Sequence, residues 1–454
     1  MNKPSEKVYK YQQVVNFIEK ELLPDLSTGD LLPDSETLCR QLNCSLITLN
    51  HALRLLSERR LIQRVRNRGS VVIARPRTLN TTKTVRVMGI SLPSGWNFMQ
   101  GMEFMLRRYG QWHPEIDFRF EYPPYNEWKE RLLNGCCDLF FGNSQAMAAL
   151  MNSDELRSCF MPLDQFKGLH FSQTDFPDKI IQYCSHFNRW RAVPLTVSPV
   201  LLLLKPEHKN LQKQLMRCDL PEFLQILEQL QQSGRPVLGF RISLNYFGTL
   251  LRAANIDAFT GKENFADQFL NKDMQKALAM FSDITTQRKL IYLGQLPYGL
   301  PSDFGLSMTL SSPIYFQANP EVQLHVAPPP GYWKKSGTPL FIEGVIPGID
   351  CDPEIIVPIL NYLQSAAVQF QLSGAAGLPA RNDMRELMLS HLEPAYPGLS
   401  ETFQRVLPYA QIVYCADKAA ERIACEYLSG IITGLLPAAS GCRQLAKKIS
   451  RLTS

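Results

Sequence analysis

Five arginines that follow one another closely are the residues whose chemistry is easiest to interpret. No carboxylate occurs from Arg59 to Met102, so no nearby acidic residue in the sequence neutralises them. Guanidinium groups form bidentate hydrogen bonds with phosphate, and a local field of one sign favours a polyanionic partner. The arginines are Arg59, Arg60, Arg64, Arg66 and Arg68. They predict contact with a nucleic-acid backbone; a basic surface that is only solvated is the alternative.

The last three of these arginines lie on a segment with the pattern of a β-hairpin. Its sequence, LIQRVRNRGSVVI, alternates apolar and polar residues on both sides of the tip. Asn67 and Gly69 at that tip both accept the positive φ that a tight turn requires. We therefore expect a hairpin that lays Arg64, Arg66 and Arg68 along DNA phosphates or into the minor groove. Docking of this basic hairpin on a protein is the weaker alternative.

Three helices are expected before the hairpin. The first has Val14, Ile18 and Leu22 on one face and ends near Pro24. A turn through Gly29 and Pro33 leads to a short second helix that Asp34 or Ser35 can cap. The third helix can be capped by Ser45, and its apolar positions are Leu49, Ala52, Leu53 and Leu56. Its outward positions near the start are Leu46, Ile47, Thr48, Asn50, His51 and Arg54. Three helices and a basic hairpin predict a winged helix-turn-helix.

The segment LLPDSETLCRQLNCSLITLNHALRLLSERRLIQRVRNRGSVV resembles the GntR-type winged helix. The matching positions are Leu32-Pro33, Ser45, Thr48, Ala52-Leu53 and Arg68-Gly69-Ser70. The resemblance implies a DNA-binding domain over residues 1–76, with contacts from Ser45, Thr48, Asn50, His51, Arg54, Arg64, Arg66, Arg68 and Gly69. The chain departs from the family at Leu46 and Asn50, where arginine is usual, and at Glu36, where a basic residue is common. Since asparagine prefers adenine and leucine makes only apolar contacts, the family's usual operator is not expected.

The rest of the chain predicts an α/β architecture. A polar, threonine-rich stretch at 77–85 is predicted to be a linker. It is followed by the strand TVRVMGISLP, the helix WNFMQGMEFMLRRYG, the strand DFRFEY, the helix NEWKERLLNG and the strand CDLFFG. Strands that alternate with helices through short connections predict a parallel sheet covered by helices. Ligands bind such sheets beyond the carboxyl ends of the strands.

Most of the range 86–440 resembles the solute-binding proteins that serve carbohydrate transporters, the type-II periplasmic-binding fold, and the sensor domain is expected over residues 86–454. The resemblance rests on several segments in order, among them WNFMQGMEFMLRRYGQWHPEIDFRFEY, CCDLFFGNSQAM, FNRWRAVPLTVSPVLLLLKPE and VQFQLSGAAGLPARND. It implies two α/β lobes joined by crossing strands, the long one at 192–204, with a small molecule in the cleft between them. The chain departs from the family at Leu203-Leu204-Lys205, where Tyr-Asn-Lys is usual.

Sugar sites combine stacking aromatic rings with hydroxyl, amide and carboxylate groups, and the resemblance suggests which residues supply them. The candidates are Trp96, Asn97, Tyr125, Asn143, Ser144, Thr196, Ser198, Tyr246, Trp333 and Glu343. Asn143 and Ser144 can equally cap the helix that follows them, and Arg381 can be a structural ion-pair partner. Trp112, Trp128 and Trp190 fall on helix or strand patterns and are expected to be core residues.

The chain of 454 residues is 45% hydrophobic and 20% charged, which indicates two or three folded domains. The first 76 residues hold twelve basic and eight acidic residues. The longest apolar stretch, AVPLTVSPVLLLL, contains two prolines and is too short to span a membrane. Eleven cysteines without a CxxC pair, and an N-terminus without an apolar signal, predict a cytoplasmic protein with reduced thiols.

The sequence thus predicts a DNA-binding regulator, expected to be a homodimer, whose two-lobed domain senses a sugar or oligosaccharide. Three alternatives are a type-I periplasmic-binding sensor or a non-sugar effector, an aminotransferase-like domain, and a transport receptor. No segment has the context of a Schiff-base lysine, the seven histidines lack metal spacing and no GxSxG occurs. We therefore expect no enzyme activity, no cofactor, no metal and no membrane partner.

Overall fold

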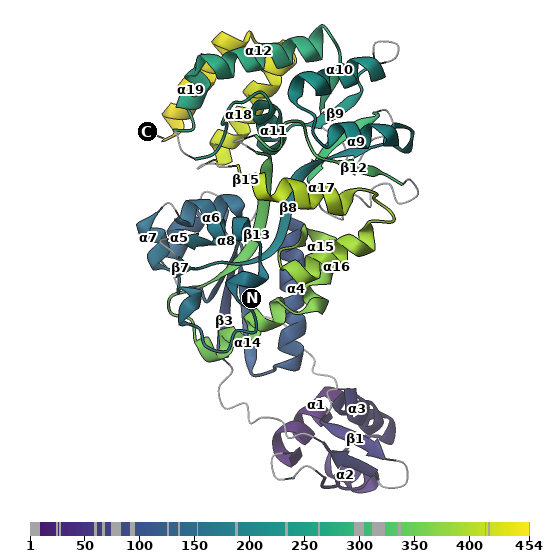
Figure 1. Ribbon diagram of the computed structural model, residues 1–454. Helices are drawn as coiled ribbons and strands as arrows, with labels where there is room; N and C mark the ends of the chain where they lie inside the picture. The colour runs from purple at the N-terminus through teal and green to yellow at the C-terminus, as the bar shows by residue number, and fades with distance from the viewer. Residues whose placement is uncertain are drawn as a thin grey trace, which may run out of the picture. The chain divides into compact units, whose positions relative to one another are not determined.

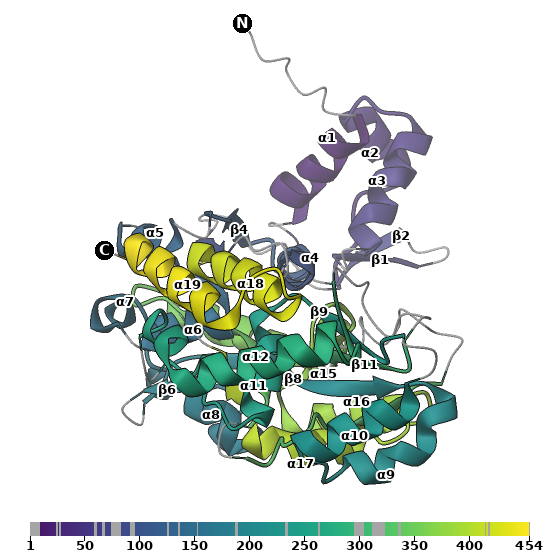
Figure 2. The same ribbon diagram turned by 90° about the horizontal axis from the view of Figure 1, so that it is seen from above.

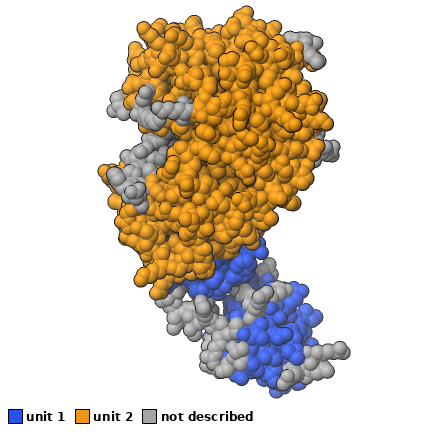
Figure 3. All heavy atoms as spheres, viewed as in Figure 1, with its two compact units in different colours: residues 1–84, 107–118 blue, residues 85–106, 119–454 orange. Residues whose placement is uncertain are grey.

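The computed structural model contains two compact units, coloured separately in Figure 3. The smaller unit comprises residues 1–84 and 107–118, and the larger comprises residues 85–106 and 119–454. The structure describes residues 10–23, 26, 29–58, 61–65, 69–73, 83–90, 96–124, 127–134, 137–151, 153–186, 189–231, 235–261, 264–294, 304–310, 323–334, 337–413, 415 and 418–453.

The smaller unit contains the expected three helices and a hairpin. Helix α1 (Lys10–Phe17) runs into a π-helical turn (Ile18–Leu22) and is followed by α2 (Ser35–Gln41) and α3 (Leu46–Glu58). Strands β1 (Ile62–Val65) and β2 (Gly69–Val72) pair antiparallel. The core comprises Val14, Ile18, Leu38, Leu49, Ala52, Leu53, Leu56, Ile62 and Val72, with Leu22 and Leu42 at its edge. The predicted apolar faces of all three helices are confirmed.

Local chemistry explains where these elements begin. Asp34 accepts a hydrogen bond of 2.8 Å from the Thr37 backbone N–H and so caps α2. Ser45 accepts one of 3.2 Å from the Thr48 backbone N–H and so caps α3. Gly69 opens β2 with a φ of 97°, a value that residues with a Cβ rarely adopt. The chain before α2 extends this sheet, since the Leu32 N–H donates to the Ser70 carbonyl at 2.9 Å. The hairpin tip at 66–68 lies outside the described residues.

The alternation of strands and helices predicted after the linker is confirmed. The elements are β3 (Lys83–Gly89), α4 (Trp96–Trp112), β4 (Ile116–Glu121), α5 (Trp128–Asn134), β5 (Leu139–Asn143) and α6 (Ser144–Met151). Strands β3 and β5 pair in parallel, as expected for this connectivity. Because β3 begins at Lys83, the last three residues of the expected linker at 77–85 lie in a strand.

A single long strand, β8 (Val193–Leu204), organises the larger unit. All twelve of its residues are buried. Its first half pairs with β13 (Pro339–Pro347), and its second half pairs with β11 (Leu306–Leu310) and β12 (His325–Ala327). The sheet order is β10-β9-β11-β8-β13-β5-β3-β4, so β8 belongs to both lobes (Figure 1). This confirms the crossing strand predicted at 192–204; β13, its antiparallel neighbour, was not predicted.

Helices cover the sheet in both lobes. The first lobe adds α7 (Asp154–Ser158), α8 (Asp178–Cys184) and the small hairpin β6 (Ser185–His186) and β7 (Arg189–Trp190). The second lobe adds α9 (Gln212–Leu215), α10 (Leu220–Leu230), β9 (Leu238–Arg241), α11 (Leu244–Ala253), α12 (Lys272–Thr286) and β10 (Ile291–Gly294).

The C-terminal part of the chain is mostly helical. It comprises α14 (Pro353–Leu363), α15 (Ala366–Ala375), β14 (Leu378–Pro379), α16 (Asn382–Leu392), α17 (Leu399–Val406), β15 (Gln411–Ile412), α18 (Lys418–Ile432) and α19 (Ala438–Thr453). Helices α18 and α19 contact each other and α12, as Figure 2 shows from above. In the described part of the chain, length and hydropathy allow no single helix to span a membrane; only the bent pair Pro353–Leu363 and Ala366–Gly374 passes that test together.

The tryptophans show how well the expected core matches the observed one. Trp128 and Trp190 are buried, as predicted. The prediction for Trp112 was wrong, because its side chain is 57% exposed. Trp112 is the last residue of α4, where the apolar face of the helix ends, and the Arg108 guanidinium lies 5.1 Å from the centre of its ring. A cation–π contact at the surface accounts for its position.

Candidate functional site

The start of α3 presents an exposed surface with the chemistry of a major-groove reader. Leu46 is 55% exposed and Ile47 is 83% exposed. Beside them, the hydroxyl groups of Ser45 and Thr48 lie 2.9 Å apart, and both hydroxyls belong to the helix cap. An apolar pair beside hydroxyl groups suits contact with thymine methyl groups and phosphates.

Two of the predicted DNA-contacting residues are joined to each other. The Arg64 guanidinium on β1 donates a hydrogen bond of 2.9 Å to the side-chain oxygen of Asn50 on α3. His51 instead stacks its ring on Tyr11 of α1, with ring centres 4.4 Å apart, so its ring packs against α1. Arg54 is exposed on α3, and Gly69 begins β2. Arg66 and Arg68 lie outside the described residues.

In the larger unit, three predicted ligand residues lie side by side on neighbouring strands. Glu343 on β13 is directly opposite Asn143 on β5 and directly opposite Thr196 on β8. Cross-strand partners share one face of a sheet, so the three side chains form a row, which we call the β5–β13–β8 row. Ser198 lies two positions after Thr196 and therefore on the same face. The three residues belong to segments that lie far apart in the sequence.

The centre of the row is a buried acid. Glu343 is 5% exposed, and its carboxyl accepts a hydrogen bond of 2.8 Å from the Thr196 hydroxyl. Burial raises the pKa of Glu343 to about 8, and the Thr196 hydrogen bond opposes that rise. Glu343 is therefore largely protonated at neutral pH, and a protonated carboxyl can donate as well as accept hydrogen bonds.

The neighbours of Glu343 have structural partners. Asn143 accepts a hydrogen bond of 3.1 Å from the Ala146 N–H and so caps α6, which Ser144 begins. This is the capping role that the sequence left open. Ser198 is buried, and its hydroxyl lies close to the backbone of the turn after α15. A Cβ atom added to Gly377 in that turn would be 2.4 Å from the Ser198 hydroxyl.

Two further predicted ligand residues lie outside the three strands of the row. Tyr246 is buried on α11, and Trp333 is half-buried with its ring 5.1 Å from that of Tyr332. Trp96 and Asn97 begin α4 but their side chains are not described, and Tyr125 lies outside the described residues. Arg381 pairs with Asp383 at 2.7 Å, which confirms the ion-pair alternative.

Metal binding finds no support in this arrangement. Within the described ranges, no group of three or more histidine, cysteine, aspartate or glutamate side chains is placed to hold a metal ion. Cys137 and Cys184 have pKa values raised above their ordinary range by burial, which disfavours thiolates at those positions.

The first 72 residues contain a match to a known protein family, and the larger part of the chain is similar to solved structures. Residues 10–72 match the family described as bacterial regulatory proteins, gntR family. No curated protein sequence matches the chain.

Three solved structures similar to the chain are solute-binding proteins. An ABC substrate-binding protein from Listeria monocytogenes in complex with cycloalternan has a TM-score of 0.58 at 12% identity, covering 82% of this chain and 99% of that one. Maltose-bound MalE3 of T. maritima has a TM-score of 0.58 at 14% identity, covering 81% and 99%. UgpB from Mycobacterium tuberculosis in complex with glycerophosphocholine has a TM-score of 0.59 at 14% identity, covering 81% and 98%.

The N-terminal part of the chain is thus a GntR-family winged-helix domain, and the larger part has the two-lobed fold of solute-binding proteins. The predicted fold class is confirmed, and so is the predicted GntR-type domain at the N-terminus. For the larger part, identities of 12–14% establish only the fold.

Proposed function

We propose that the protein is a ligand-responsive transcriptional regulator. The observation that carries this proposal is the pairing of a GntR-family winged helix with a fold whose lobes share one central strand, β8. A strand common to both lobes is suited to a hinge, because small changes along it change the angle between the lobes. Ligand that favours one lobe arrangement then shifts the population of DNA-binding forms.

The proposed effector is a sugar or an oligosaccharide. The row formed by Asn143, Glu343 and Thr196 places an amide, a carboxyl and a hydroxyl group on strands that adjoin the lobe junction. These are the groups that bind sugar hydroxyls. Two of the similar structures hold the saccharides cycloalternan and maltose. A glycerophosphodiester is the second candidate class, because another structure of the same fold holds glycerophosphocholine.

The proposed DNA complex is that of a cytoplasmic homodimer on a two-fold symmetric operator. A single winged helix offers few contacts, and two heads on half-sites one helical turn apart add their binding energies. The contacts proposed for each head are Ser45, Thr48, Asn50, Arg54, Arg64, Arg66, Arg68 and Gly69. His51 contributes less directly, since its ring stacks on Tyr11.

A thermal-shift screen of the full chain against mono- and oligosaccharides, glycerophosphocholine and amino acids tests the sensor. Ligand at about a hundred times its Kd stabilises the bound form by roughly 2.7 kcal/mol, which raises the melting temperature of the two-lobed unit by several degrees. An operator selected from random duplex DNA then reports coupling through fluorescence anisotropy. Operator affinity that stays constant while a saccharide saturates the protein would refute the regulatory proposal. A shift with a non-sugar class alone would replace the carbohydrate effector.

A further inference from the structure

The first lobe contains a pocket that is separate from the β5–β13–β8 row. Its volume is about 450 Å³, and its lining includes Arg157, Phe160, Pro162, Arg189, Arg191 and Ile349. Ile349 follows the end of β13 and is six residues after Glu343 in the sequence. Six residues of extended chain span roughly 20 Å, so the pocket is at a distance from the row. The volume falls within the range of pockets that bind small molecules.

Three arginines bring positive charge together at this pocket. Arg191 donates from Nη1 to the Phe160 carbonyl at 2.8 Å and to the Arg157 carbonyl at 3.4 Å. Its Nε is buried and has no hydrogen-bond partner among the described residues. Burial lowers the pKa of Arg191, the nearby charges of Arg189 and Arg157 lower it further, and the charge of Asp164 opposes this shift. The guanidinium is thus held in place and is incompletely compensated.

Two of the three arginines pair with carboxylates at the edge of the pocket. Arg189 pairs with Asp164 at 3.1 Å, and both side chains are about half exposed. Arg157 pairs with Asp154, whose side chain is 94% exposed while that of Arg157 is 11% exposed. Among the described ion pairs at the pocket, Asp154 and Asp164 are thus the carboxylates that lie beside the three guanidinium groups. A partly buried guanidinium whose Nε has no acceptor among the described residues favours an incoming anion, because phosphate and carboxylate match the geometry of its N–H groups.

We propose that this pocket binds a small molecule that carries one phosphate or carboxylate group. The anionic group lies between Arg157, Arg189 and Arg191, and the rest of the molecule packs against Phe160, Pro162 and Ile349. Ile349 is 43% exposed, so it offers apolar surface to a ligand. The site does not depend on the proposed sugar site, since no residue is shared between them.

Calorimetric titration of the full chain with inorganic phosphate, and separately with acetate, tests the proposal at fixed ionic strength in chloride. Arg189→Gln removes one guanidinium and is expected to weaken anion binding by about tenfold. Asp154→Asn removes a competing carboxylate and is expected to strengthen binding several-fold. Opposite effects from two surface substitutions are not expected if the residues act only in folding. Phosphate and acetate titrations distinguish a phosphate ligand from a carboxylate ligand.

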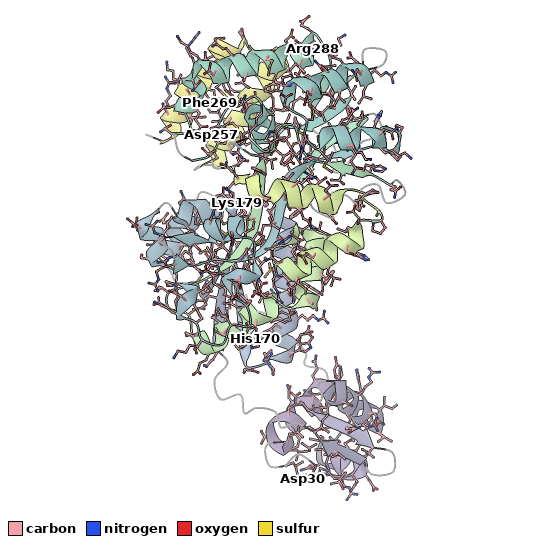
Figure 4. All side chains as sticks on the ribbon, in the orientation of Figure 1. Asp30, His170, Lys179, Asp257, Phe269 and Arg288 are labelled. Atoms are coloured by element: carbon pink, nitrogen blue, oxygen red, sulfur yellow. The ribbon has the colours of Figure 1, made fainter. Side chains whose placement is uncertain are left out.

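Two control variants locate the binding. Arg288→Gln breaks a comparable surface ion pair with Glu228 in the other lobe, where Figure 4 labels Arg288, and is expected to leave binding unchanged. Arg405→Gln likewise breaks an i,i+4 surface ion pair, with Glu401, and is also expected to leave binding unchanged. Absence of saturable binding by either anion at tens of millimolar, or saturable binding that neither Arg189→Gln nor Asp154→Asn changes, overturns the proposal.

Discussion

The Arg64 guanidinium on β1 donates a hydrogen bond of 2.9 Å to the Asn50 side-chain oxygen on α3. Both side chains are at the surface, so the bond contributes little to the stability of the domain. It bears on the proposed DNA recognition, because a bidentate contact between asparagine and adenine uses that same oxygen together with the side-chain NH₂ group. In the proposed complex, the bond to Arg64 would therefore influence how Asn50 contacts a base.

Arg64→Ala and Asn50→Ala are expected to weaken DNA binding in different ways. Loss of Arg64 removes a phosphate contact, so affinity falls for every sequence and the slope of log K against log salt flattens by about one. Loss of Asn50 changes sequence preference by roughly 1–3 kcal/mol at one position and leaves the slope unchanged. Anisotropy titrations at several salt concentrations measure both effects. An Arg64→Ala protein with the wild-type slope would show that Arg64 does not contact phosphate.

Substitutions at Ser45 separate capping from DNA contact. Ser45→Ala removes the hydrogen bond to the Thr48 N–H and is expected to cost about 1 kcal/mol of stability. Ser45→Asp keeps a capping oxygen and hence the stability, but adds a negative charge at the proposed phosphate contact. Affinity for DNA should therefore fall more in Ser45→Asp than in Ser45→Ala. The reverse order would place Ser45 away from the DNA backbone.

The winged helix could be predicted from the sequence because its signals are local. The caps at Asp34 and Ser45, the spacing of the apolar residues in α3 and the turn residues before Gly69 all lie within a few positions of the elements they define. The Arg64–Asn50 bond was not predictable, because it depends on how the hairpin folds back on α3. The stacking of His51 on Tyr11 has the same origin.

The candidate ligand site was predicted residue by residue but not as an arrangement. Asn143, Thr196 and Glu343 were each proposed, yet their adjacency depends on the antiparallel insertion of β13 between β5 and β8. Strand register between distant segments has no local sequence signal. The basic pocket was missed for a similar reason: Arg157 lies on α7, whereas Arg189 and Arg191 lie on and just after β7.

Thr196→Val tests whether the row supports the fold of the two-lobed unit. The substitution removes the donor to Glu343 and is expected to cost about 1–3 kcal/mol, because a buried carboxyl loses its partner. Thr249→Val is a matched control, since the buried Thr249 hydroxyl bonds only to a carbonyl one turn earlier in α11. All five tryptophans follow the winged helix in the sequence, so their fluorescence during urea unfolding reports on the larger part of the chain. Equal losses in the two variants would argue against a special role for the row.

Glu343→Gln is expected to alter how stability depends on pH. The Glu343 pKa is about 8 in the folded protein against an ordinary value of 4.5, so between these pH values the folded protein retains a proton that the unfolded chain loses. Rising pH therefore destabilises the wild type across this window, by on the order of 5 kcal/mol at about 1.36 kcal/mol per pKa unit.

Glutamine matches the shape of protonated glutamate and does not titrate, so the variant should lack this loss. Its stability relative to the wild type should increase as pH rises from 5 to 9, as measured by urea unfolding followed through tryptophan fluorescence. Glu354→Gln, which changes an exposed carboxylate at the start of α14, should leave the pH dependence as it is in the wild type. If Glu343→Gln also preserved that dependence, Glu343 would have to be ionised in the folded protein, and the row would present a fixed negative charge to any ligand.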